Sequence, residues 1–194
     1  MAALIGGLIA GQLHVAPAAA AVPPFSDTGG HPFAGARPAH NRRMGSTDRR
    51  GLSGEAASWH RLHELTDRLT PETAAIPGYF EEGWTAKDAV AHIGTWMARG
   101  AQMLRQIAAG TYREGEIDVD AENERFLAAM RDVPLETVHL QVASARGELL
   151  SAWAALPEIT QPAAYWVRKA GPEHYAEHLP RLEAWVNELA HRRS

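Results

Sequence analysis

Two histidines four residues apart stand near the C-terminus, in the stretch EHYAEHLP. On a helix, His174 and His178 would occupy successive turns of one face, about 5 to 6 Å apart, so their ring nitrogens could share one ion. Imidazole nitrogens bind zinc at about 2.0 to 2.1 Å. Pro180 follows two residues later and challenges the helix, because proline lacks an N–H and crowds the preceding turn. The spacing predicts two ligands of a metal site if the segment is helical.

The apolar pattern indicates that the helix continues across Pro180. Tyr175 and Leu179 precede the proline, and the apolar residues Leu182, Val186 and Leu189 follow it in the same helical phase. This pattern favours one kinked helix, which opens at Gly171-Pro172 and ends near His191. Both histidines precede the proline, so the turn that carries them does not need its missing donor.

A third histidine lies on the inward side of another predicted helix. At 100° per residue, His92 falls at the border of an apolar face that includes Ile93, Trp96 and Met103. On the predicted C-terminal helix, His178 lies inside the apolar face and His174 lies at its edge. A single inward histidine is most often a hydrogen-bonded core residue. Three inward histidines on two helices instead favour a metal site at His92, His174 and His178.

The other histidines lack this combination of spacing and face. His60 and His63 are three residues apart and could chelate, but His63 lies beside the Trp59 stripe while His60 points away, which favours a solvated or rim pair. His139 has apolar neighbours and no companion at ligand spacing. The rest belong to the tail or to the last turn, namely His14, His31, His40 and His191.

Composition and missing motifs exclude several other kinds of chemistry. The chain has no cysteine, which excludes disulfides, thiolate zinc sites and a cysteine nucleophile. The nucleophile motif G-x-S-x-G and the two common phosphate-binding glycine motifs do not occur. The acidic run EGEIDVDAENE lacks the ligand spacing and central glycine of an EF-hand. The formal net charge of −4 provides no basic surface, so we do not expect nucleic acid as a partner.

The elements that would position the histidines are four amphipathic helices. They are predicted at Glu55–Leu69, from Thr85 to about Ala109, from near Asp120 to Leu156 with a break at Pro134, and from Gly171 to about His191. Thr85 and Asp88 have the spacing of a capping box. Helices of this length bury their apolar faces most simply against one another. We therefore predict an all-α fold, a four-helix bundle over residues 53–194.

Residues 1–52 are rich in alanine, glycine and proline and are predicted to form a disordered tail. The apolar start is similar to a signal peptide, but no lysine or arginine precedes Arg37. Met44 offers an alternative start, so translation or export of residues 1–43 stays open. No apolar run reaches the roughly 20 residues of a membrane-spanning helix. We expect a cytoplasmic protein, and its outer helix faces could support a homodimer.

Two segments together resemble a known family. GWTAKDAVAHIGTW contains the pattern W-[ST]-x-[KR]-D-x-x-x-H, and HYAEHLPRLEAW follows about 80 residues later with H-x-x-x-H. Their combination resembles the DinB-like superfamily, whose four-helix bundles include the metal-binding domain of mycothiol-dependent maleylpyruvate isomerase and the bacillithiol S-transferases. The resemblance covers about residues 53–189. It implies a divalent ion, zinc or nickel, bound by His92, His174 and His178, with open positions for water or a thiolate.

The resemblance also implies a reaction class. Isomerase-type relatives often have glutamate where this chain has His174, so the triad is more similar to the all-histidine, S-transferase side. The first hypothesis is a thiol-dependent transferase or isomerase that acts on a small electrophilic molecule, with a low-molecular-weight thiol as cosubstrate. Glu177 and Tyr175 are candidate neighbours of the ligands, with Trp96 and Trp185 as pocket wall. The alternatives are a metal-dependent hydrolase on the same triad and a non-enzymatic bundle that binds a ligand or partner.

Overall fold

A computed structural model of the chain describes Leu52, residues 54–80 and residues 83–192. This part of the chain is helical and forms no β-strand, although Pro77 and Thr85 make one isolated antiparallel bridge. The helices are α1 (Glu55–Thr66), α2 (Pro71–Ala74), α3 (Ala86–Ala108), α4 (Val119–Met130), α5 (Leu135–Ala154), α6 (Gln161–Ala170) and α7 (Pro172–His191). Apart from Leu52, the predicted tail and the Met44 start lie outside the described residues.

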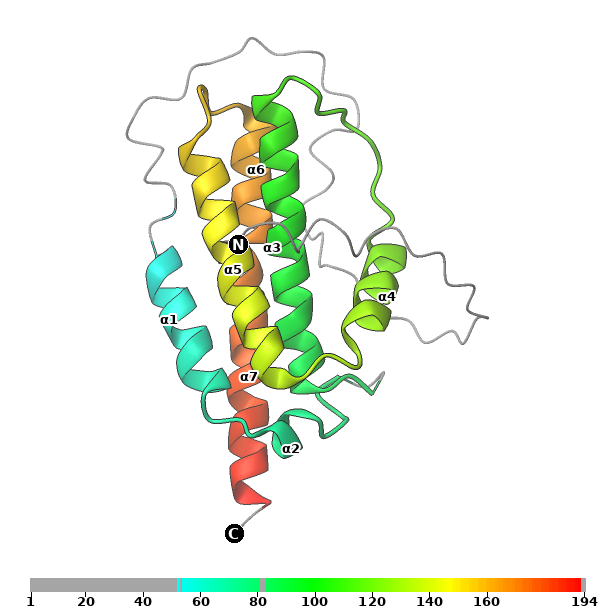
Figure 1. The fold of residues 1–194 in the computed structure, drawn as a ribbon. Helices are drawn as coiled ribbons and strands as arrows, with labels where there is room; N and C mark the ends of the chain where they lie inside the picture. The colour runs from blue at the N-terminus through cyan, green and yellow to red at the C-terminus, as the bar shows by residue number, and fades with distance from the viewer. Residues whose placement is uncertain (1–51, 53, 81–82, 193–194) are drawn as a thin grey trace.

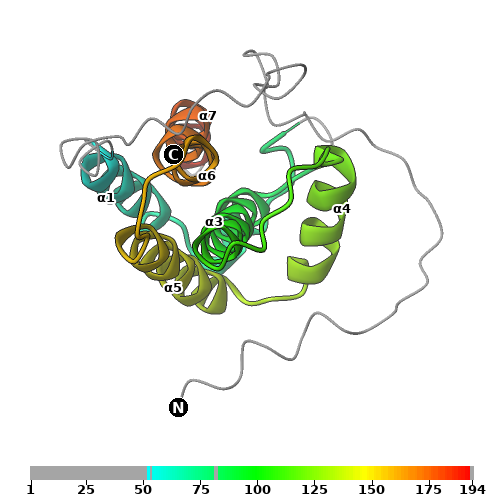
Figure 2. The same ribbon diagram turned by 90° about the horizontal axis from the view of Figure 1, so that it is seen from above.

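The helices are arranged around α3. Figure 1 shows α1, α3 and α5 lengthwise beside a column in which α6 stacks on α7. Seen from above, α6 again lies over α7, while α4 stands on the outer side of α3 (Figure 2). α3 contacts α4, α5, α6 and α7, and the buried apolar side chains form one core. This arrangement brings α3 and α7, the two helices with the predicted ligands, into contact.

Proline and capping residues set the helix starts as predicted. α3 begins after Thr85, α5 after Pro134 and α7 at Pro172. α7 also continues through Pro180 to His191 as a single helix, as the helical spacing of its apolar residues predicts. Two helices end earlier than predicted. α1 ends at Thr66 and α5 ends at Ala154.

The sequence prediction missed α6 and treated the chain between Leu156 and Gly171 as a connection. Thr160 caps this helix by accepting a hydrogen bond from the Ala163 backbone N–H at 3.3 Å. The buried residues of α6 follow the spacing of one helical face and are Ala163, Trp166, Val167 and Ala170. A threonine before a glutamine-proline pair is a recognisable helix start, so the signal was present in the sequence.

Two glycines allow the helices next to α3 to approach closely. A Cβ built on Gly94 would lie 2.7 Å from Val142 Cγ2, and one built on Gly100 would lie 2.5 Å from the Ala170 Cβ. Both distances are shorter than van der Waals contact. Gly94 therefore sets the spacing between α3 and α5, and Gly100 sets the spacing between α3 and α6.

Gly100→Ala is expected to lower the free energy of unfolding by about 1 to 3 kcal/mol, because the added methyl overpacks a filled contact. Gly147 in α5 provides a matched control, since a Cβ there would meet no atom within 4 Å. Gly147→Ala should stabilise the protein by up to about 1 kcal/mol through helix propensity. Urea unfolding of both variants measures the difference. Equal changes in the two variants would contradict the packing role of Gly100.

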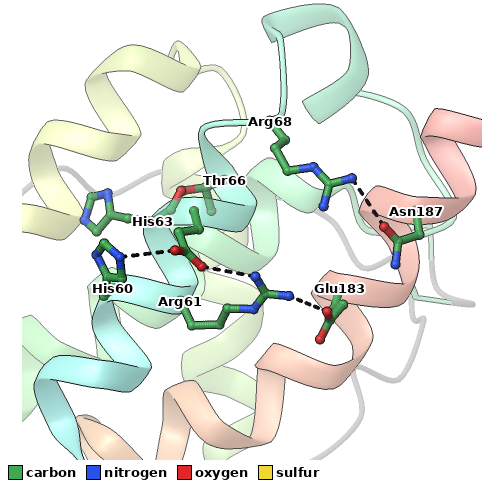
Figure 3. A network of polar contacts seen from close by, with 8 residues as sticks. His60, Arg61, His63, Thr66, Arg68, Glu183 and Asn187 are labelled. Carbon is green, nitrogen blue, oxygen red and sulfur yellow. Dashed lines mark hydrogen bonds and ion pairs between the residues drawn. The ribbon is translucent and has the colours of Figure 1, made fainter.

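α1 is attached to α5 and α7 by polar contacts. The buried Glu55 carboxylate accepts hydrogen bonds from Arg146 Nε at 2.6 Å and Arg146 Nη2 at 2.7 Å, and from the Tyr175 hydroxyl at 3.3 Å. Figure 3 shows a second, exposed set of contacts, in the second half of α1 and just beyond its end. There Arg61 pairs with Glu183, and Arg68, two residues after α1, donates to Asn187 at 3.3 Å. The buried contacts join three helices, whereas the exposed ones join α1 and the residues that follow it to α7.

Among the described residues, the helices are all too short or too polar to cross a lipid bilayer. This finding agrees with the apolar pattern of the sequence in that part of the chain.

Candidate metal centre

A capping box holds the start of the helix that carries His92. The Asp88 backbone N–H donates to the Thr85 hydroxyl at 3.1 Å, and the Thr85 backbone N–H donates to Asp88 Oδ2 at 3.0 Å. These reciprocal bonds satisfy two donors that a helix start otherwise leaves without partners. His92 lies about two turns further along α3, on its buried side.

The other two histidines lie in the first two turns of α7. Pro172 occupies the first turn, where its missing N–H costs nothing, and the Tyr175 backbone N–H closes that turn on Gly171 O at 3.1 Å. His174 and His178 are separated by one further turn. Both precede Pro180, so the proline does not interrupt the segment that presents them.

The three histidines converge on one point between α3 and α7. His174 Nε2 lies 3.0 Å from His92 Nε2 and 3.2 Å from His178 Nε2. Their ligand atoms all lie within 4.8 Å of one another. Among the described residues, these three are the histidine, aspartate or glutamate side chains that gather closely enough to share an ion.

The separations of His174 Nε2 from the other two Nε2 atoms fit ligands of one divalent ion. Nitrogens at 2.0 to 2.1 Å from a common ion, with angles near 95 to 105°, are about 3.0 to 3.3 Å apart. Hydrogen bonding explains the cluster less well. A ring nitrogen carries either one hydrogen or one lone pair, so His174 Nε2 cannot make a good bond to both neighbours. The donor set therefore fits a metal, and three ligands leave further coordination positions open.

Burial keeps the three imidazoles neutral. His92 and His174 are 7% and 1% exposed, and burial, followed by the neighbouring imidazoles, places the pKa of each well below the usual 6.5. Burial lowers the pKa of His178 to about 4. Neutral imidazole is the form that binds metal, so at pH 7 none of the ligands has to lose a proton.

The ligand group contains no carboxylate. A divalent ion bound by three neutral imidazoles would keep its full double charge in a buried setting. Such a site favours an anion in the open positions, because the attraction is weakly screened away from water. The centre is therefore suited to hydroxide, a thiolate or the carboxylate of a small molecule.

Aromatic side chains surround the triad. The Trp84 ring lies 5.4 Å and the Trp96 ring 6.5 Å from the His92 ring, and the Phe80 ring lies 6.2 Å from the His178 ring. Trp84 and Phe80 belong to the connection before α3. The sequence motif includes Trp84, but neither ring was predicted to lie beside the triad. The aromatic residues in PGYFEEGW were the signal for this wall.

The predicted neighbours of the ligands have different positions. Trp96 does lie beside His92, but Trp185 packs against Tyr79, with ring centres 6.3 Å apart. Glu177 is exposed, 3.9 Å from Lys169 Nζ, and is not part of the ligand group. Tyr175 turns its hydroxyl to Glu55. The chain therefore places aromatic rings near the triad, while the acidic side chain predicted there faces solvent.

The remaining described histidines stay apart from the triad. His60 is exposed and pairs with Glu64 at 3.1 Å (Figure 3). The His63 ring packs on Trp59 with ring centres 4.4 Å apart. His139 is half-buried on α5. The prediction that His60 and His63 form a rim pair rather than a chelate agrees with these contacts.

Comparison with known proteins shows a shared fold. The sequence matches no family model and no curated protein. The crystal structure of an uncharacterised protein from Escherichia coli UTI89 is similar, with a TM-score of 0.61 and 13% identity over 72% of this chain and 92% of the other. At this identity the similarity concerns the fold alone. The DinB-like resemblance therefore stays a prediction.

The metal-free protein is expected to lose stability as the pH falls from about 6.5 to about 4. Unfolded histidine has a pKa near 6.5, whereas His178 in the folded state has a pKa of about 4, so protons bind preferentially to the unfolded chain in this window. The shifted pKa of His178 alone would lower the free energy of unfolding by up to about 3 kcal/mol over this window. The loss levels off below the folded-state pKa. Urea unfolding in EDTA at pH 7.0, 5.5 and 4.0 measures it. His178→Gln should show a flatter profile, and parallel profiles would contradict the expectation.

Proposed function

We propose that this protein is a divalent-metal-binding four-helix bundle of the DinB-like type, in which α6 and α7 together form one of the four rods. We further propose that it binds zinc or nickel through His92, His174 and His178, and that it is a thiol-dependent transferase or isomerase of small electrophiles. The observation that carries the proposal is the convergence of the three Nε2 atoms. Those of His92 and His178 lie 3.0 and 3.2 Å from that of His174.

The charge of the site supports a thiol as the reacting partner. A bound divalent ion would favour the anionic form of a thiol at neutral pH. The three imidazoles hold the ion without neutralising it, since the group contains no carboxylate. The rings of Trp84, Trp96 and Phe80 lie beside the triad, and apolar neighbours of this kind strengthen electrostatic attraction because they screen charge less than water does. The chain has no cysteine, so the sulfur has to come from a low-molecular-weight thiol.

In such a reaction the thiol loses its proton to solvent, and its sulfur then forms a bond to an electrophilic carbon. In transfer, the leaving group departs with the electron pair of the bond that breaks. In isomerisation, the sulfur adds to a conjugated double bond, and the adduct rotates about the single bond that results. Elimination then restores the double bond and releases the thiol. The sequence resemblance supports this class of reaction, and the E. coli protein of similar fold adds no information about activity because it is uncharacterised.

A hydrolase is the second candidate, supported by the same uncompensated charge. Water would then take the place of the thiol as nucleophile. The two candidates differ in one requirement, because only the transferase or isomerase depends on an added thiol.

The test measures turnover of zinc-loaded and nickel-loaded protein with N-acetylcysteine and 1-chloro-2,4-dinitrobenzene, and separately with 4-nitrophenyl acetate without thiol. We expect turnover that requires both metal and thiol and that His178→Ala abolishes. Thiol-independent ester cleavage would instead support the hydrolase. A folded protein that takes up no metal would overturn both and favour a non-enzymatic binding bundle.

A further inference from the structure

The inward face of α4 is formed around a buried amide. Asn123 is 1% exposed and is the buried residue of this helix. Phe126, three residues later, packs on Trp96 with ring centres 5.6 Å apart. An apolar residue would serve packing against α3 better, since a buried polar side chain loses its hydration. The choice of asparagine at this position therefore calls for a hydrogen-bonding explanation.

One end of the amide has a partner and the other does not. Trp96 Nε1 donates to Asn123 Oδ1 at 2.8 Å. An indole N–H can only donate, so the amide oxygen must face it, and the NH₂ group must occupy the other position. Asn123 Nδ2 is buried and has no hydrogen-bond partner among the described residues. A buried donor left in this state costs about 1 to 3 kcal/mol.

Both ends of α4 are fixed, so the amide is held in place. At the start, the Ala121 backbone N–H donates to Asp118 Oδ1 at 3.0 Å. Beyond the end, Lys87 Nζ donates to three backbone carbonyls, those of Met130, Arg131 and Val133, at 3.4, 2.5 and 3.0 Å. Lys87 lies in the first turn of α3, the helix that carries His92. α3 therefore anchors both the metal ligand and the helix that presents the amide.

Trp96 links the amide to the triad, because it lies beside His92 and contacts Asn123. Trp96 follows His92 by one helical turn, with ring centres 6.5 Å apart, and its indole N–H is the group that contacts Asn123. A molecule that binds at the triad and extends along the Trp96 ring would therefore reach a fixed donor that has no hydrogen-bond partner among the described residues. This is the arrangement of a site in which an ion holds one group of a ligand and a neutral donor holds another.

We infer that Asn123 Nδ2 binds a carbonyl oxygen of the molecule whose sulfur occupies the triad, so that the site selects thiols with a carbonyl group a few atoms from sulfur. This inference rests on the proposed thiol-dependent function. A site built to hydrogen-bond such an oxygen discriminates against analogues without it, because the donor is then left unpaired.

The test uses cobalt(II)-loaded protein and the charge-transfer absorption that a thiolate produces on binding cobalt. The probes are 3-mercaptopropionamide and 4-mercaptobutyramide, each compared with the alkanethiol of equal chain length. We expect at least one amide thiol to bind about 10-fold more tightly than its alkanethiol, equivalent to 1.4 kcal/mol. Asn123→Leu should reduce this ratio to near one at unchanged metal content.

Asn123→Asp provides a second variant that keeps an acceptor for Trp96 and replaces the donor with a carboxylate oxygen, so the test holds if the leucine variant does not fold. Asn187→Asp is the control, since Asn187 is exposed on α7 and contacts Arg68. The same ratio in the wild type and both Asn123 variants would overturn the inference while leaving thiol binding established. No charge-transfer band with any thiol would overturn the proposed function as well.

Discussion

His174→Ala is expected to lower the affinity for Zn²⁺ by at least about 100-fold. Loss of an outer-shell partner alone costs about 10- to 100-fold, and His174 is the central ligand, with its Nε2 within 3.2 Å of both other Nε2 atoms. The wild type should also gain about 2.7 kcal/mol of stability when free zinc is 100 times the dissociation constant. Competition with a chromophoric chelator measures the affinity, and thermal unfolding with and without zinc measures the stabilisation.

The control for this experiment is His60→Ala, because His60 is exposed and pairs with Glu64 within its own helix. Protein without a histidine tag should be used, so that bound metal reports the triad. We expect the His60 variant to keep wild-type affinity and stabilisation. Equal metal content in the wild type and in the triple variant His92→Ala, His174→Ala, His178→Ala would refute the metal site.

Arg146→Met is expected to lower the free energy of unfolding by about 3 to 5 kcal/mol. The change removes the two hydrogen bonds that Arg146 donates to Glu55, which is 4% exposed, and leaves a buried carboxylate without its counter-charge. It also removes the guanidinium that stacks 4.8 Å from the Trp59 ring. Since domains of this size are stable by about 5 to 15 kcal/mol, the loss would be a large share of the total. Urea unfolding at pH 7 with saturating zinc measures it.

Arg105→Met is the matched control, because Arg105 pairs with Glu148 at 3.1 Å on the surface. An exposed pair contributes about 1 kcal/mol or less. The double variant Glu55→Gln, Arg146→Met should recover part of the loss, since it removes the unpaired charge. If Arg146→Met and Arg105→Met cost the same, Glu55 does not depend on Arg146 for its buried state.

The parts of the structure that follow from local pattern could be predicted. Helical periodicity placed His92, His174 and His178 on inward faces, and the structure brings them together. Thr85, Pro134 and Pro172 start their helices where capping and proline rules place them. These features depend on residues within a few positions of one another, which a single sequence contains in full.

Features that depend on distant residues could not be predicted in this way. Glu55 and Arg146 are 91 positions apart, and no local pattern pairs them. The amide of Asn123 lies in the acidic stretch before Pro134, and only the packing of α4 on α3 shows that it is buried and bonded to Trp96. The omission of α6 is of another kind. The sequence contains its capping threonine and apolar spacing, but the prediction treated the segment as a connection.

The positions of the three ligands along the chain have a consequence for folding. His92 and His174 are 82 residues apart, and the chain between them includes α4, α5 and α6. An ion held by both would act as a removable cross-link across most of the fold, in a protein that has no cysteine to form a permanent one. For a covalent link that closes a loop of this length, loss of unfolded-chain entropy stabilises by about 4 to 5 kcal/mol. Metal supply would then set how tightly the core is closed, in addition to what the site can react with.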